Sequence, residues 1–164
     1  MSKVKRRISQ FFRQRRGAAA IEFALVFSLL LVLVMGIVDM GHAWYLKQVL
    51  TNASREGARY AVRYQTNGAG QHLMPNQLTP SVQNYILNTS AQNGGVGGQG
   101  LTSSLPANAS PSITLSGPGY TDGLAGHDLT VTVTAQKYWF VIDNFIPGLG
   151  SHITITVSTD MKVE

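Results

Sequence analysis

The sequence predicts an α+β fold in which one long N-terminal helix precedes a small C-terminal antiparallel sheet. Three observations predict it. Residues 23–38 form a run of 16 residues without a charge. Apolar residues then recur at helical spacing as far as Tyr64, and from Ile113 onward they recur at every second position. We expect four segments, which are residues 1–17, 18–38, 39–64 and 65–164.

The first segment is strongly basic. It holds seven of the 13 Lys and Arg residues and no acid, whereas the rest of the chain holds six bases against eight acids. The net charge of +5 therefore belongs to a short tail and does not indicate a nucleic-acid-binding protein. The chain has no cysteine, which excludes disulfides and Cys-based zinc sites.

Residues 18–38 are expected to cross a membrane. A helix of this length is about 31 Å long, which matches the roughly 30 Å hydrocarbon core of a bilayer. Lys and Arg near a span stay cytoplasmic, so the chain after residue 38 should lie on the outer, periplasmic side. The alternative is a secretory signal peptide cut near Gly41–Ala43, but the uncharged run exceeds the usual apolar region of about 7–15 residues.

Residues 39–64 continue the helix as an amphipathic extension. Its apolar side carries Leu46, Val49, Leu50, Ala53, Gly57, Tyr60, Ala61 and Tyr64. The opposite side carries Lys47, Thr51, Arg55, Arg59 and Arg63, each four residues apart and hence in one stripe. Glu56 is within reach of Arg59 at i+3. This basic stripe is either a solvated face or a contact for anionic headgroups or an acidic partner.

Residues 65–164 are expected to form a small α+β domain. One short helix is predicted at 80–92, followed by a glycine-rich loop at 93–100 that lacks the strand and helix of a phosphate-binding motif. Alternating residues predict half-buried strands at 113–115, 129–133 and 153–157. They should form a sheet that rests one face on the amphipathic half of the helix, with a turn at 143–150.

Two positions near the end of this domain interrupt the alternation. Residues 138–142, YWFVI, are apolar on both faces, which indicates either a strand buried on both sides or a docking surface for a neighbouring subunit. Lys137 precedes them and suggests a bulge.

No pattern of catalytic or metal-binding residues is present. His42, His72, His127 and His152 never fall at i+3 or i+4, so no helical metal pair is expected. His127 beside Asp128 is interpreted as a surface pair. We expect no enzymatic activity, cofactor or small-molecule substrate.

Glu22 is a carboxylate near the start of the apolar segment. If the chain is cut after Gly17, the new amine belongs to Ala18 and Glu22 lies in the first turn of the helix. There the carboxylate faces the positive end of the helix dipole and can meet an ammonium, its own or that of a neighbouring subunit. The alternative is that Glu22 only extends to the interface.

A family resemblance rests on these residues. The basic leader, Gly17, Glu22 and Phe23 resemble the processing site of type IV prepilins of the short-leader Flp class. Residues 17–62 closely resemble the TadE-like proteins, which are pseudopilins or minor pilins of the tight-adherence pilus. The most specific stretch is LTNASREGARYA at 50–61, with the motif residues Asn52, Ala53, Arg55, Glu56, Gly57, Arg59 and Tyr60. Residues 131–164 resemble the end of that family more loosely.

The resemblance implies a pilin-like fold and a role in assembly or initiation of a Tad/Flp-type pilus. Residues 1–17 would be a prepilin leader, cut between Gly17 and Ala18 by a prepilin peptidase that recognises Glu22 and Phe23. The implied partners are this peptidase, other pilins or pseudopilins, the pilus assembly platform and the lipid bilayer of the inner membrane. Two alternatives remain, which are an unprocessed single-span protein with a periplasmic ligand- or partner-binding domain and a secreted or anchored enzyme.

Overall fold

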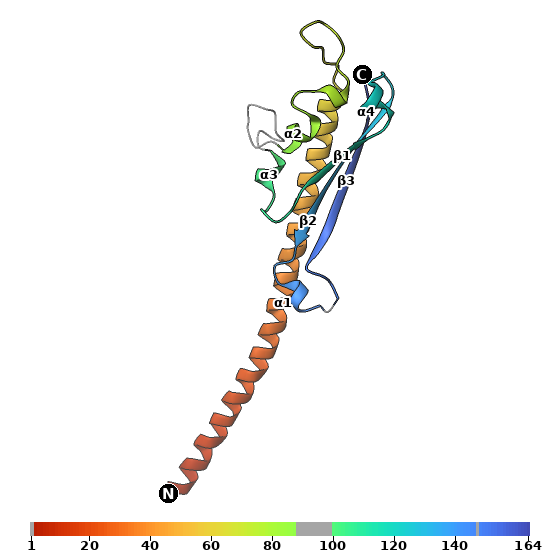
Figure 1. Ribbon diagram of the computed structural model, residues 1–164. Helices are drawn as coiled ribbons and strands as arrows, with labels where there is room; N and C mark the ends of the chain where they lie inside the picture. Colours follow the sequence, from red (N-terminus) through yellow and green to blue (C-terminus); the bar gives the residue numbers. More distant parts are fainter. Residues whose placement is uncertain (1, 88–99, 147) are drawn as a thin grey trace.

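The protein is built around one helix that is much longer than the rest of the fold (Figure 1). The computed structural model describes residues 2–87, 100–146 and 148–164, without the side chains of residues 2–16 and 144. Helix α1 spans Ser2–Val62 without a break, which gives a rod of about 90 Å. The expected continuous helix is confirmed, and it ends two residues before Tyr64.

The C-terminal part of the chain forms the expected antiparallel sheet. Its strands are β1 (Ser112–Ser116), β2 (Asp128–Tyr138) and β3 (His152–Lys162), in the order β1-β2-β3. β2 and β3 pair without interruption from Asp128↔Lys162 to Tyr138↔His152. Each strand shows the predicted alternation: buried and half-buried side chains alternate along most of β2, and half-buried and exposed ones alternate along β1 and β3.

Short helical turns connect these elements. They are η1 (Pro75–Gln77), α2 (Val82–Leu87), α3 (Leu101–Ser104), α4 (Pro118–Asp122) and η4 (Ile142–Asn144). The helix predicted at 80–92 is present from Val82 to Leu87, and its second half lies outside the described residues. The glycine-rich loop also lies outside them, except for Gly100, the N-cap of α3.

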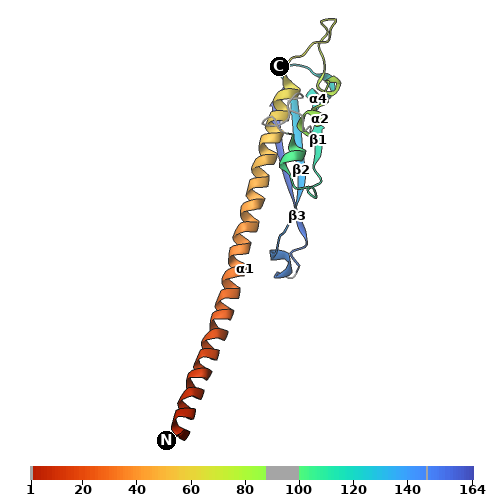
Figure 2. The ribbon, with the colours of Figure 1, turned by 90° about the vertical axis from the view of Figure 1, so that its left-hand side faces the viewer.

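The core lies between the C-terminal half of α1 and one face of the sheet. Helix α1 contributes Leu46, Leu50, Ala53, Ala58 and Ala61, and the sheet contributes Leu129, Val131 and Val133, all buried. The small residues of α1 let the sheet and α2 approach the helix backbone closely. Figure 2 shows the helix and the sheet as two layers side by side along the upper half of the molecule.

The other face of the sheet is polar. Cross-strand hydrogen bonds join Thr130 to Asp160, Thr132 to Ser158 and Thr134 to Thr156, with oxygen–oxygen distances of 2.6, 2.9 and 3.2 Å. Such pairs stabilise a solvated sheet face without any apolar burial. The arrangement is the predicted α+β, pilin-like one, a long helix on a small sheet.

Two local predictions about the end of β2 are wrong. Lys137 does not mark a bulge, because it pairs in regular register with Ile153 and its side chain is fully buried. Of the two alternatives for residues 138–142, the strand buried on both faces is wrong, because β2 ends at Tyr138 and Phe140 is exposed. The other alternative, a docking surface, stays a prediction. One buried carboxylate on α1 accounts for both differences.

Candidate functional site

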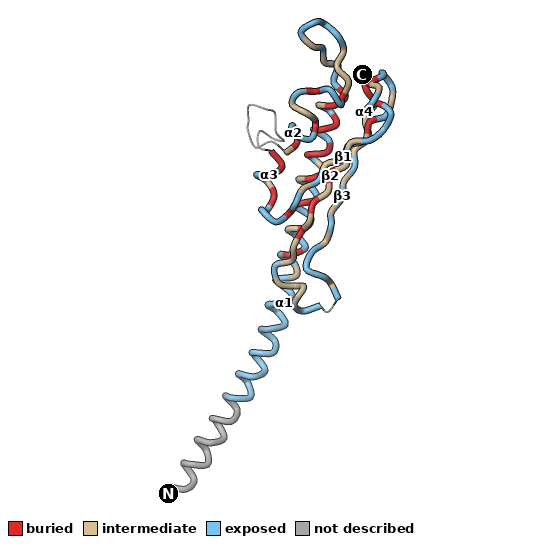
Figure 3. Tube along the Cα trace, viewed as in Figure 1, coloured by how far each residue is buried: buried red, intermediate tan, exposed pale blue. Residues whose placement is uncertain are grey.

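The stretch of α1 from Gly17 to Val38 is mostly apolar and has few contacts with the rest of the described protein. Every residue from Gly17 to Val38 is exposed except Val32 and Gly36, which are partly covered. Figure 3 shows this exposed rod projecting from the packed part of the molecule. An 18-residue window in the helix has a mean hydropathy of 2.7 and no residue buried inside the protein. The helix is therefore long and apolar enough to cross a membrane, and its lack of protein partners favours lipid over a protein core.

The expected processing residues lie at the start of this exposed rod. α1 runs through Gly17 and Ala18 as regular helix, and a side chain added at Gly17 would meet nothing within 4 Å. Glu22 is exposed. Phe23 is also exposed and stacks on Phe27, with ring centroids 5.6 Å apart. All four positions are exposed in the part of the chain that the structure describes, so they are accessible to an outside partner.

The other end of the apolar run is held by a buried carboxylate. Asp39 directly follows residues 23–38 and is fully buried. Its Oδ1 accepts hydrogen bonds from Lys137 Nζ and, at 2.9 Å, from the backbone N–H of Phe140. Its Oδ2 accepts from the backbone N–H groups of Val141 and Ile142, both at 3.3 Å. A single side chain of α1 thus holds the end of β2 and the start of the next loop.

The buried ammonium of Lys137 has its partners beside Asp39. Its ammonium lies 4.5 Å from the centroid of the Trp139 ring and 4.8 Å from that of Phe140, in addition to its ion pair with Asp39. Burial alone raises the pKa of the Asp39 carboxyl, but the hydrogen bonds from Lys137 and from three backbone N–H groups outweigh burial and lower it below its ordinary value. The Asp39 carboxyl is therefore ionised in the folded protein at neutral pH.

This ion pair explains the two wrong predictions. A lysine that points into the core would be too costly to bury in a regular strand without an acidic partner. Asp39 on the packed helix is that partner. The carboxylate also accepts hydrogen bonds from the backbone N–H groups of residues 140–142. These groups are then not available for strand pairing, and β2 ends at Tyr138. The sequence does hold a signal for the pair, since Asp39 and Lys137 are lone charges of opposite sign at positions whose neighbours predict burial.

The family-motif residues divide between two sides of α1. Asn52, Arg55 and Arg59 are exposed, whereas Ala53 and Gly57 are buried against the domain. A Cβ added at Gly57 would lie 2.2 Å from Ile86 Cδ1 of α2, so glycine at this position lets α2 approach the helix backbone. The basic stripe is exposed at Lys47, Arg55, Arg59 and Arg63, as its solvated interpretation requires.

Glu56 and Tyr60 connect α1 to the segment around α2. The Tyr60 ring stacks on Tyr85 with centroids 4.0 Å apart, and its hydroxyl donates to the Pro80 carbonyl at 2.8 Å. The Tyr85 hydroxyl donates to Glu56 at 3.2 Å, and Glu56 also forms the expected contact with Arg59 at 3.9 Å. Burial raises the pKa of both tyrosines, so they stay neutral donors. These motif residues serve the packing of the domain.

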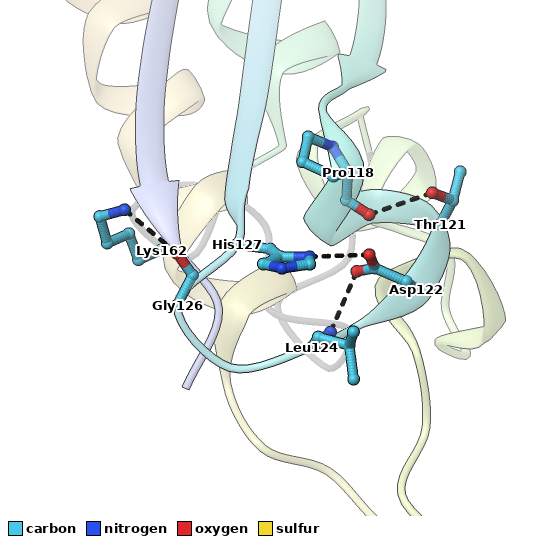
Figure 4. A network of polar contacts seen from close by, with 7 residues as sticks. All are labelled: Pro118, Thr121, Asp122, Leu124, Gly126, His127 and Lys162. Atoms are coloured by element: carbon cyan, nitrogen blue, oxygen red, sulfur yellow. Dashed lines mark hydrogen bonds and ion pairs between the residues drawn. The ribbon is translucent and has the colours of Figure 1, made fainter.

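A polar network closes the far end of the sheet (Figure 4). Asp122 Oδ2 lies 2.7 Å from His127 Nδ1, and its Oδ1 accepts from the Leu124 N–H at 3.1 Å. The hydrogen bond from the Leu124 backbone N–H and, after it, the one with the His127 side chain lower the pKa of Asp122. His127 and its neighbour Asp128, interpreted from the sequence as surface residues, have different partners, since Asp128 pairs with Lys162 at 3.1 Å. The network fixes the connection between α4 and β2.

The remaining histidines are not gathered into one site. His72 stacks on Tyr64, and His152 lies against Tyr138, at opposite ends of the domain. In residues 2–87, 100–146 and 148–164 there is no group of three His, Cys, Asp or Glu side chains that could hold a metal ion.

Comparison with known protein families finds a match within helix α1. Residues 17–59 match the family model described as TadE-like protein, and the resemblance stated for this segment is thereby confirmed. The match begins at Gly17, contains the whole apolar run and the Asp39 junction, and ends within the 50–61 motif. No curated protein and no solved structure matches the chain.

Proposed function

We propose that this chain, a TadE-like protein by its N-terminal helix, is a pseudopilin or minor pilin that acts in assembly or initiation of a Tad/Flp-type pilus. TadE-like proteins are structural components associated with this pilus and not known enzymes. The observation that carries the proposal is the match over residues 17–59, on a helix with an apolar stretch of which no residue is buried inside the protein.

The proposed location is the inner membrane, crossed once by residues 18–38. The seven basic residues that precede Gly17 favour a cytoplasmic N-terminus. The sheet and its connections would then lie in the periplasm. The proposed partners are a prepilin peptidase, other pilins or pseudopilins, the assembly platform and the bilayer.

Cleavage between Gly17 and Ala18 would change the charge at the start of the span. The new ammonium would lie one helical turn from the Glu22 carboxylate, close enough for an ion pair within the chain or with a neighbouring subunit. A helix that is exposed on all sides can exchange lipid for other apolar helices without losing packing, so the same surface serves storage in the membrane and lateral assembly.

N-terminal mass spectrometry of membrane-derived protein tests the proposal. We expect the mature chain to begin at Ala18, and replacing Gly17 with a bulky residue should leave the leader attached. A functional protein that keeps Met1 or Ser2 would contradict processing and favour an unprocessed single-span protein with a partner-binding domain.

The role of Glu22 has its own test. Glu22→Ala should reduce processing or piliation, whereas Glu56→Ala, which removes an acid from the other half of α1, should leave the mature N-terminus unchanged. Normal processing and piliation in the Glu22 variant would refute the role given to this carboxylate.

A further inference from the structure

The loop between β2 and β3, residues 139–151, is unusually apolar for an exposed connection. Its sequence is WFVIDNFIPGLGS, with one acid and no base. Phe140, Phe145 and Ile146 are 60%, 55% and 46% exposed. Isolated exposed apolar residues are ordinary, but three large ones in a single loop require an explanation.

The loop lies at the level where the apolar run of α1 ends. Figures 1 and 2 both show it beside α1, at the end of the sheet that faces the exposed half of the helix. Asp39 fixes this height, because it binds the N–H groups of Phe140, Val141 and Ile142. The position of the loop is therefore set by hydrogen bonds to the first residue after the span.

The loop also reaches past Asp39 into the apolar run. A Cβ built at Gly36 would lie 3.5 Å from Ile142 Cδ1, which places Ile142 beside the last turn of the run. Val32 and Gly36 are the two partly covered residues between Gly17 and Val38, and they lie one turn apart on the helix side that carries Asp39. The exposed apolar surface of the loop thus continues the exposed apolar surface of the helix.

Aromatic residues of α1 surround the same level. Trp44 and Tyr45 are exposed at 72% and 55%, and they lie about 8 Å beyond Asp39 along the helix. Trp and Tyr gather at the boundary between hydrocarbon and water, because their rings are amphipathic. Together with the aromatic residues of the loop, they form a group of exposed aromatic side chains near the end of the apolar run.

We propose that loop 139–151 is a second membrane contact, which inserts Phe145, Ile146 and Phe140 into the interfacial layer of the bilayer beside the helix that spans it. The contact is apolar, because the loop has no base to attract anionic headgroups. Two contacts, the helix and the loop, fix the orientation of the sheet relative to the membrane. Extraction of the helix for assembly then requires withdrawal of the loop as well. This proposal does not depend on cleavage at Gly17.

Depth-dependent fluorescence quenching tests it in the full chain. The sequence has no cysteine, so single cysteines can carry a fluorophore at Phe145, at Val38 within the apolar run and at Ala69 in the exposed loop beyond α1. The labelled proteins are reconstituted into phosphatidylcholine vesicles that contain acyl-chain nitroxide lipid. We expect the label at 145 to be quenched several-fold more strongly than the label at 69, and to approach the label at 38. Adding phosphatidylglycerol should not change this order.

Two outcomes would overturn the proposal. One is a label at 145 that lipid nitroxide quenches no more than the label at 69. The other is energy transfer between labels at 145 without lipid quenching, which would make a second copy of the chain the occupant of the loop. A label at Ile146 with an unchanged circular dichroism spectrum repeats the measurement in a second variant, so a misfolded Phe145 variant cannot decide the result.

Discussion

The two halves of α1 have the same backbone structure but opposite surroundings. Residues 17–38 are mostly apolar and almost all exposed, whereas from Asp39 to Val62 one side of the helix is buried against the sheet and α2. The residue type alone does not decide burial, since Leu30 is exposed and Leu50 is buried in the same regular helix. The presence of small residues and a buried charge in the second half allows a domain to pack there.

The largest expected effect comes from breaking the ion pair at the boundary between the halves. Asp39→Asn or Lys137→Met should each lower the free energy of unfolding by about 3–5 kcal/mol, because each leaves one buried group without its partner. Thermal unfolding of the full chain in detergent micelles, followed by circular dichroism, measures the loss.

The double variant measures the interaction energy between Asp39 and Lys137, apart from the cost of losing each side chain. Asp39→Asn combined with Lys137→Met removes both charges, so it should be less destabilised than the two single variants added together. Strict additivity would show that the two side chains do not act on each other.

A matched pair of leucines tests the contrast in packing. Leu50→Ala should cost about 2–5 kcal/mol, because it leaves a cavity between α1 and the sheet. Leu30→Ala removes the same atoms from the exposed half and should leave the unfolding temperature of the domain nearly unchanged. Equal losses in both variants would mean that residues 17–38 belong to the folded core.

The smallest effect concerns a titration at the boundary. Burial, followed by the charge of Lys137, lowers the pKa of His42 below 6.5, while Asp39 opposes the shift. The unfolded chain therefore binds this proton more readily, and stability should fall as pH drops from about 6.5 toward the folded pKa. His42→Phe keeps the ring near Phe140 and should flatten this part of the pH profile. Unfolding temperatures at pH 7 and pH 5.5 measure the difference, and an identical slope in both proteins would contradict it.

The predictions that succeeded rest on periodic patterns. The continuous helix, which was expected to reach residue 64 and ends at Val62, the three alternating strands and the Glu56–Arg59 contact all depend on spacing within a few residues. The apolar side of α1 was also read correctly from Leu46 to Ala61, although Tyr64 lies beyond the helix and is exposed. The prediction for Tyr64 was wrong because helical spacing does not determine where a helix ends.

The predictions that failed concern partners far apart in the chain. Lys137 alone suggests a defect in a strand, and Asp39 alone is one acid at the end of an apolar run. Their separation of 98 residues hides the pair from any local pattern. The Asp122–His127 contact was not predicted either, because it depends on the turn between α4 and β2, which brings the His127 ring to Asp122.

The amino-acid sequence by itself determined the long helix, its apolar half and the alternating strands, since each depends on the backbone period and on the free energy of removing apolar groups from water. The family resemblance also came from the sequence, through its motif residues. Only the tertiary structure decided where the strand ends and how the loop 139–151 is aimed. The reason is that a buried charge is tolerated only opposite its partner, and the packing of sheet on helix determines which residues become partners.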